Sequence, residues 1–320
     1  MTVSWLRRTA VLVAACASAA LIAGCGSGSV ESAISPTRFV TFGDGMSDVG
    51  QTGTRYTVND GSVNIWTQQL ASRYGVNLTA ASAGGSGYAQ INSRISLKPD
   101  AAGVSTTPTM TEQIGTFLAS GAPRSTDLFL IGGGTSDILA GFAAYRANPT
   151  TAGAAQFTAA ATQAGTELGN QVQRLVNAGA RYVLVTNLYD ISRSPLGTSS
   201  GQAAALTAAT RGFNDALKLS IQNLGSNVLL VDAENYFNLV ISFPTSYSFT
   251  NGTTVVCTSV DAGNGIGTGT GQINSGLCNS GTIAAGLDPA LYEFADNVYF
   301  TPQAQRLFGN FAYDRLRLRF

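Results

Sequence analysis

Histidine is absent from all 320 residues of the sequence. Because histidine is the side chain most often used for proton transfer near neutral pH, any catalytic mechanism for this chain must work without an imidazole. Charged residues are also few, at 11% of the chain, and the 18 basic residues balance the 18 acidic ones. A balanced charge gives no bulk attraction to nucleic acid or to an anionic membrane surface. We therefore expect no nucleic-acid partner.

A long apolar run is found only near the N-terminus. Arg7 and Arg8 precede an apolar stretch over residues 10–22, which is too short to span a membrane comfortably and predicts a cleaved secretory leader. The stretch ends in the sequence IAGC, and this segment resembles a bacterial lipobox. The resemblance implies that Cys25 becomes the lipid-modified first residue of the mature protein. An ordinary leader followed by an incidental cysteine is the alternative.

These features predict three parts of the chain. Residues 1–24 are the lipoprotein signal peptide, residues 25–37 are the lipidated Cys25 with a flexible tether, and residues 38–320 are a single domain. We expect a protein of the cell envelope, either lipid-anchored in the periplasm or at the outer membrane, or secreted. Its contact with the membrane would come through the lipid anchor only.

Two further cysteines, Cys257 and Cys278, lie in a stretch between residues 250 and 282 that is rich in Gly, Ser, Thr and Asn. In an oxidising compartment they would pair, and closing this loop would stabilise the fold by ~3 kcal/mol. Two thiols without histidine are not a metal-binding set. We expect a disulfide here, no metal and no cofactor.

Short apolar runs alternate with longer helical patterns along residues 38–320. The strand candidates are Arg38–Phe42, Leu128–Ile131, Tyr182–Thr186 and Val228–Val231, with a shorter one near Asn77–Ala80. Apolar residues three or four apart mark helices over residues 157–176, 206–221 and 304–312. This alternation predicts an α/β fold, a three-layer αβα sandwich with a flavodoxin-like parallel sheet of about five strands. Ligands of such sheets bind beyond the carboxyl ends of the strands.

The turn after the first predicted strand, residues 42–50, has the sequence FGDGMSDVG. It resembles the first block of GDSL/SGNH-type ester hydrolases, usually FGDSxSDxG, in which the first serine is the nucleophile. In this chain Gly45 stands at the nucleophile position. Ser47 aligns with the second serine of the block and not with the nucleophile.

The resemblance continues through most of the domain. Residues 64–75 look like the family's first helix, and residues 84–95, GGSGYAQINSRI, resemble a segment whose glycine pair gives a backbone N–H to the oxyanion hole. In this chain the pair is Ile91-Asn92. Asn92 could still supply the backbone N–H, but the glycine's conformational freedom is lost. Residues 130–137, LIGGGTSD, resemble the IGGND block. Ser136 takes the place of its oxyanion asparagine, with Thr135 as the alternative because the segment is one residue longer.

The last block, residues 295–302, has the sequence ADNVYFTP and resembles the family's DxxHPT. The aspartate is present as Asp296, but Tyr299 replaces the histidine base. A phenol with an unperturbed pKa of about 10 is protonated at neutral pH and cannot simply take over the role of the base.

The family positions therefore predict a GDSL/SGNH-type lipoprotein that is catalytically inactive, a pseudoenzyme that reuses the cleft to bind a lipid, acyl-ester or glycan ligand. The alternative is a residual carboxylic-ester hydrolase that uses Ser47 or Ser136 with a carboxylate or a lysine. Only Lys98 and Lys218 are present, and neither lies in a matched block. A purely structural envelope protein has no feature in its favour.

Overall fold

A computed structural model describes residues 32–62 and 65–320 of the protein. The predicted signal peptide and Cys25 lie outside the described residues. At the centre is a four-stranded parallel sheet with the strand order β1-β2-β3-β4. Its strands are β1 (Arg38–Gly43), β2 (Asp127–Gly132), β3 (Tyr182–Thr186) and β4 (Val228–Val231). These four strand predictions are confirmed, as is the α/β class.

The fifth strand expected near Asn77–Ala80 does not form, so the prediction of about five strands is wrong. Isolated bridges join Gly87 to Ala80 and to Thr41 of β1 instead. Gly85 and Gly87 explain the difference, because the chain turns back on itself there. A Cβ on Gly85 would lie 2.3 Å from the carbonyl oxygen of Thr79, and one on Gly87 would lie 3.0 Å from it. After this turn, residues 86–90 line the edge of β1, where Thr41 N–H donates to Ser86 O at 3.1 Å and Tyr88 N–H donates to Thr41 O at 2.8 Å.

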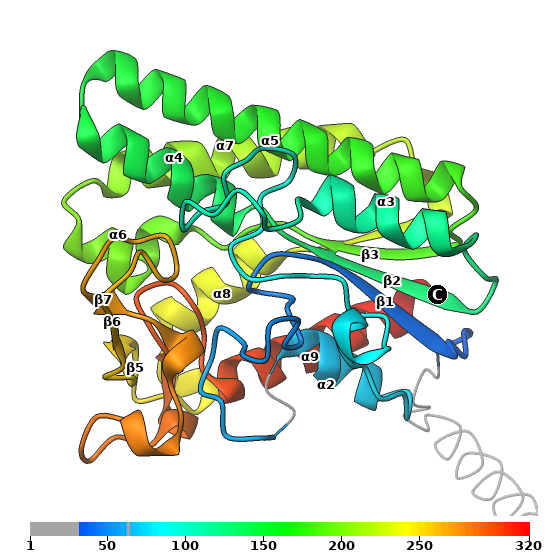
Figure 1. The fold of residues 1–320 in the computed structure, drawn as a ribbon. Helices are drawn as coiled ribbons and strands as arrows, with labels where there is room; N and C mark the ends of the chain where they lie inside the picture. The colour runs from blue at the N-terminus through cyan, green and yellow to red at the C-terminus, as the bar shows by residue number, and fades with distance from the viewer. Residues whose placement is uncertain (1–31, 63–64) are drawn as a thin grey trace, which may run out of the picture.

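Helices cover both faces of the sheet, which gives three layers (Figure 1). One face carries α3 (Met110–Ser120), α4 (Thr135–Ala147), α5 (Thr151–Asn177) and α7 (Ala203–Ile221); the other carries α2 (Trp66–Ser72), α8 (Ala233–Ser242) and α9 (Pro302–Arg319). The three helices predicted from apolar spacing are confirmed as α5, α7 and α9. Thr301 caps α9 and Pro302 occupies its first turn, where the missing N–H of proline has no cost.

Shorter helical segments complete the chain between these elements. They are α6 (Pro195–Ser199) and the 3-10 turns Ala81–Ala83, Ile191–Arg193, Gly225–Asn227, Pro244–Tyr247, Ser275–Leu277, Ser280–Thr282 and Pro289–Leu291.

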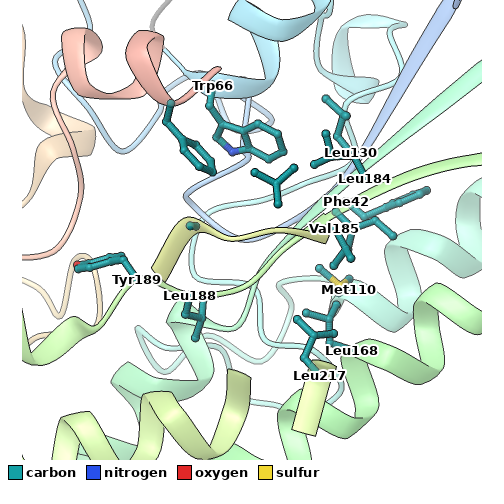
Figure 2. Packing of buried hydrophobic residues seen from close by; sticks show 14 of the residues in the cluster. Phe42, Trp66, Met110, Leu130, Leu168, Leu184, Val185, Leu188, Tyr189 and Leu217 are labelled. Carbon is teal, nitrogen blue, oxygen red and sulfur yellow. The ribbon is translucent and has the colours of Figure 1, made fainter. Parts of the chain in front are cut away.

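The main core lies between the sheet and the two helix layers. All six residues of β2 are buried, as expected for a parallel strand covered on both faces. Figure 2 shows Trp66 of α2 on one side of the strand residues Leu130 and Leu184, and Leu168 and Leu217 of α5 and α7 on the other. The core therefore continues across the sheet.

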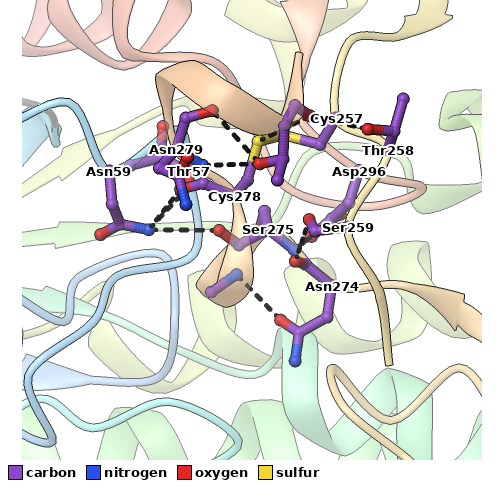
Figure 3. Close-up of a disulfide and its surroundings, with 12 residues drawn as sticks. Thr57, Asn59, Cys257, Thr258, Ser259, Asn274, Ser275, Cys278, Asn279 and Asp296 are labelled. Atoms are coloured by element: carbon purple, nitrogen blue, oxygen red, sulfur yellow. Dashed lines mark hydrogen bonds between the residues drawn. A yellow bond between two sulfur atoms is a disulfide. The ribbon is translucent and has the colours of Figure 1, made fainter. Parts of the chain in front are cut away.

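A separate small structure follows α8. Strand β5 (Asn251–Val255) pairs with β8 (Tyr292–Phe294), and β6 (Val260–Asp261) pairs with β7 (Gln272–Ile273). Cys257 and Cys278 form a disulfide with a Cα–Cα distance of 5.8 Å, which confirms the predicted pairing (Figure 3). We call residues 257–278 the disulfide loop. Both cysteines are buried in a second apolar cluster with Val58, Val256 and Ala295.

The N-terminal residues of the described chain lie beside its C-terminus. The backbone N–H of Ala33 donates to the carbonyl oxygen of Phe320 at 2.9 Å, and Thr37 N–H donates to Thr126 O at 3.1 Å.

Among the described helices, none combines the length and apolar character needed to cross a membrane.

Candidate active site

Asp44 connects the loops that follow β1 and β2. Its Oδ1 accepts the N–H of Met46 at 3.0 Å, and its Oδ2 accepts those of Gly134 at 2.9 Å and Ser136 at 3.3 Å. Burial raises the pKa of the Asp44 carboxyl to about 6, and the three N–H groups oppose that shift. The carboxyl group therefore holds the first strand's turn against the start of α4.

The other polar residues of the first block are also used for structure. The buried Ser47 Oγ donates to the carbonyl oxygen of Gly132 at 2.9 Å. Asp48 Oδ1 accepts the N–H groups of Gly50 and Gln51, and its Oδ2 accepts that of Ile91 at 2.8 Å. Burial raises the pKa of Asp48 to about 6. Since Ser47 Oγ donates to a carbonyl and has no basic partner among residues 32–62 and 65–320, none of these residues activates it as a nucleophile.

Asn92 has a left-handed backbone conformation, which is unusual for a residue other than glycine. Its φ is 61°, in the left-handed region that asparagine tolerates better than most residues. Its side chain points elsewhere, because Nδ2 donates to the carbonyl oxygen of Gly265 at 2.9 Å. Asn92 thus combines a left-handed backbone with a side chain that binds the disulfide loop.

Ser136 and the alternative Thr135 lie in the first turn of α4 and are fully buried. Within the described part of the chain, neither hydroxyl oxygen has a hydrogen-bond partner. Thr135 lines a cavity of about 20 Å³ between Trp66, Tyr189 and Phe237, which has room for about one water molecule. No acyl group could enter a space of that size.

Asp296 is held by backbone donors. Its Oδ1 accepts the N–H groups of Val298 at 2.8 Å and Tyr299 at 2.7 Å, and its Oδ2 accepts that of Ser275 at 3.1 Å. Burial raises the pKa of its carboxyl to about 6. Asp296 therefore shapes the turn before α9 and ties it to the disulfide loop, and Figure 3 shows it beside Ser275.

Tyr299 is a poor base in this position. Its side chain is fully buried, and its hydroxyl has no hydrogen-bond partner among the described residues. Burial and, to a smaller extent, the nearby Asp44 carboxyl raise the pKa of the phenol well above 10. The phenol stays protonated throughout the physiological range and cannot accept a proton from a nucleophile.

The space in front of Gly45 is already occupied. A Cβ on Gly45 would lie 2.4 Å from Cδ2 of Tyr56 and 3.2 Å from Cε1 of Tyr299. The centroids of the two rings are 4.6 Å apart, and both rings are buried. A serine side chain would not fit here unless Tyr56 moved. Tyr56 carries no motif signal in the sequence, and its part in the site is found only in the structure.

The disulfide loop packs against Tyr56 and Asn92. The carbonyl oxygen of Gly265 accepts hydrogen bonds from Tyr56 Oη at 3.2 Å and from Asn92 Nδ2. Asn264 Nδ2 donates to the carbonyl oxygen of Ala101 at 3.3 Å. The loop thus contacts Tyr56, Asn92 and Ala101, and through Ser275 also Asp296.

The structure therefore brings together the site positions predicted from sequence, namely Gly45, Asn92, Ser136, Asp296 and Tyr299, and among the described residues around them no nucleophile has a base beside it. In the described part of the chain, no three acidic or cysteine side chains lie close enough together to hold a metal ion.

Comparison with known proteins gives little further information. No family model matches the chain. A Pseudomonas putida sequence described as an uncharacterized protein in the trpE-trpG intergenic region is 26% identical over 309 residues, which cover 87% of this chain. This chain spans about half of that relative's length, 48%. The description names no activity.

Proposed function

We propose that this chain has the scaffold of a GDSL/SGNH-type ester hydrolase without its catalysis, and that it acts as a non-catalytic binding protein of the bacterial cell envelope, anchored by lipid at Cys25. One observation carries the loss of catalysis: the ring of Tyr56 fills the space that a nucleophile at position 45 would need, with 2.4 Å between Cδ2 and a Cβ built there. The absence of histidine and the buried, protonated Tyr299 agree with it.

The ligand of such a protein would bind outside the filled cleft. An open groove of about 380 Å³ lies next to it, and Asn92 is one of the residues that line the groove. It is lined mostly by hydroxyl, amide and carboxyl side chains: Thr52, Gln90, Asn92, Asp100, Thr106 and Thr107. This polar lining suits a hydroxyl-rich glycan better than an acyl chain, which needs an apolar pocket.

The test of inactivity uses p-nitrophenyl esters of short and long acyl chains and a fluorophosphonate probe. The unaltered protein is compared with Gly45→Ser/Tyr299→His and with the same variant carrying Tyr56→Ala. We expect no turnover and no labelling of the unaltered protein. We also expect none for the double variant, because Tyr56 still occupies the space. Turnover by the unaltered protein, or labelling of one defined serine in it, would overturn the proposal.

The same assay addresses the alternative of an unconventional hydrolase. Labelled Ser47 or Ser136, identified by peptide mass spectrometry, would establish it. The structure offers no base for either residue, because Ser47 donates to Gly132 and Ser136 Oγ is buried without a partner among the described residues.

Anchoring is tested separately. The intact mass of protein from the native envelope should include acyl chains at Cys25 and lose them in Cys25→Ser.

A further inference from the structure

Arginines gather at the edge of the sheet where its strands begin. Arg38 is the first residue of β1, Arg181 directly precedes β3, and Arg124 lies in the loop before β2. The end of α9 reaches the same edge, because Phe320 stacks edge-on against Tyr182 at 5.2 Å. We call the following seven residues the arginine face: Arg38, Arg73, Arg124, Arg181, Arg315, Arg317 and Arg319.

Hydrogen bonds and ring contacts place the α9 and α2 arginines on this face. Arg319 Nη2 donates to the carbonyl oxygen of Gly225, three residues before β4, at 3.0 Å. The guanidinium of Arg73, at the end of α2, lies 4.7 Å from the ring centre of Tyr313 on α9. The beginnings of the four strands and the ends of α2 and α9 therefore meet at one edge, next to the C-terminus marked in Figure 1.

The net charge of the arginine face differs from that of the rest of the domain. Two acidic residues lie there, Asp127 paired with Arg38 and Asp314 paired with Arg317. The other described residues comprise nine basic and fifteen acidic side chains. The near-zero charge of the whole chain thus conceals a strong asymmetry, with one positive edge on an otherwise negative domain.

Five of the seven arginines are exposed and form no ion pair with a described residue: Arg73, Arg124, Arg181, Arg315 and Arg319. Between two arginines of α9 lies Leu318, whose surface is 64% exposed. Arginines around an exposed leucine suit a boundary where charged headgroups meet acyl chains. An arginine near the C-terminus of a helix stabilises that helix. This effect does not explain the whole arginine face, because Arg124 and Arg181 lie in loops.

The N-terminal segment leaves the domain at this same edge. Ser32 Oγ and Ala33 N both donate to the carbonyl oxygen of Phe320. Between Cys25 and Ser32 there are six residues, so the seven Cα–Cα steps can extend over at most about 25 Å. A lipid on Cys25 would therefore keep the arginine face close to the bilayer.

We propose that the arginine face docks the domain onto the anionic phospholipid headgroups of the membrane in which the Cys25 lipid is inserted. The proposal rests on the proposed function, because it assumes that a lipid on Cys25 anchors the protein to the membrane. It adds a second, electrostatic contact, because several arginines near a surface act together within a Debye length of about 8–10 Å. Docking in this orientation turns the opposite edge of the sheet, with Asn92 and the polar groove, away from the membrane.

The test uses the processed chain from residue 25 with Cys25→Ser, so that no acyl chain contributes to binding. Its binding to phosphatidylcholine vesicles is measured by co-sedimentation with and without phosphatidylglycerol, at low and at high salt. The variant Arg124→Gln/Arg181→Gln/Arg315→Gln is compared with the control Arg146→Gln/Arg211→Gln/Arg306→Gln. The control changes the net charge equally at exposed positions elsewhere.

We expect binding only to vesicles with phosphatidylglycerol, and loss of that binding at high salt. The arginine-face variant should bind at least ~10-fold more weakly, since each arginine contributes roughly a fivefold factor, while the control stays within ~2-fold. No binding by the parent, equal loss in both variants, or equally tight binding to a soluble RNA polyanion would overturn the proposal. Because the assay requires neither lipidation nor the absence of esterase activity, its failure would leave the proposed function standing.

Discussion

The ring of Tyr56 lies where a side chain on Gly45 would have to be, with Cδ2 only 2.4 Å from the position of a Cβ. Tyr56 is held there from two sides. Its ring packs against Tyr299 at 4.6 Å, and its hydroxyl donates to the carbonyl oxygen of Gly265 in the disulfide loop. Glycine at position 45 is thus part of the packing of this site. A serine introduced at position 45 without a change at Tyr56 would meet a filled space.

The first prediction concerns this packing. Gly45→Ala should lower the free energy of unfolding by ~1–3 kcal/mol, because the added methyl group forces Tyr56 or the backbone to shift in a well-packed core. Denaturant unfolding measures the change. Gly115→Ala is the matched control, because its Cβ would meet only an ordinary contact at 3.5 Å. It lies within α3 and should stabilise the protein by ~0.5–1 kcal/mol.

A double-mutant cycle identifies Tyr56 as the cause. In a Tyr56→Leu background the cost of Gly45→Ala should fall by at least ~1 kcal/mol, because residues in direct contact do not behave additively. An unchanged cost in that background would contradict the assignment of the clash to the Tyr56 ring.

The second prediction concerns the cover of the site. Cys257→Ser/Cys278→Ser should cost ~3 kcal/mol, as the loop-entropy estimate gives for a sequence separation of 21 residues. Hydrogen exchange at residues 261–276 should also become faster, because the loop loses its closure. Reductant should bring the parent to the stability of the variant and leave the variant unchanged. Unaltered exchange would mean that contacts with Tyr56, Asn92 and Asp296 suffice to hold the loop.

Much of this architecture can be predicted from the sequence, because buried parallel strands are continuous apolar runs and long helices repeat their apolar residues every three or four positions. Strands β1 to β4 and helices α5, α7 and α9 follow from these patterns. The gathering of Asp44, Ser136 and Asp296 also follows, since each comes after a strand or just before the last helix. The missing fifth strand could not be foreseen, because it depends on the tight turn at Gly85.

The filling of the site is not predictable in this way. Tyr56 lies in an irregular segment without periodicity, and its position depends on Gly265, which is 209 residues away in the chain. The left-handed backbone of Asn92 is equally a product of tertiary contacts. Local patterns identify which residues surround the site, and only long-range packing determines whether the space between them is open.

The third prediction concerns pH and Glu293 on β8. Glu293 is buried, neither of its carboxyl oxygens has a hydrogen-bond partner among the described residues, and burial raises the pKa of the group well above 4.5. Above about pH 4.5 the unfolded chain releases this proton, whereas the folded protein retains it. The unfolded state then binds fewer protons, so stability falls as pH rises, by up to ~1.4 kcal/mol per pH unit for one group.

The measurement compares the unfolding free energies of the parent and of Glu293→Gln from about pH 4.5 to about pH 8. The buried aspartates, whose pKa of about 6 also lowers stability as pH rises, contribute equally to both proteins. Glu293→Gln should therefore have a shallower downward slope than the parent, whereas Glu112→Gln should keep the slope of the parent, because Glu112 is exposed and paired with Lys98. Equal slopes for the parent and Glu293→Gln would contradict the assignment of a protonated Glu293.

The last prediction separates two buried tyrosines that differ in one hydrogen bond. Tyr189 Oη donates to the carbonyl oxygen of Val298 at 2.6 Å, whereas Tyr299 Oη has no partner among the described residues. Tyr189→Phe should therefore lose ~1 kcal/mol or more, because it leaves a buried carbonyl without its donor. Tyr299→Phe removes a hydroxyl whose burial is not compensated, so it should be neutral or stabilising. Thermal and denaturant unfolding of the two variants give the comparison. If Tyr299→Phe were as destabilising as Tyr189→Phe, the phenol would have to make a polar contact, and its interpretation as an inert replacement for the base would be wrong.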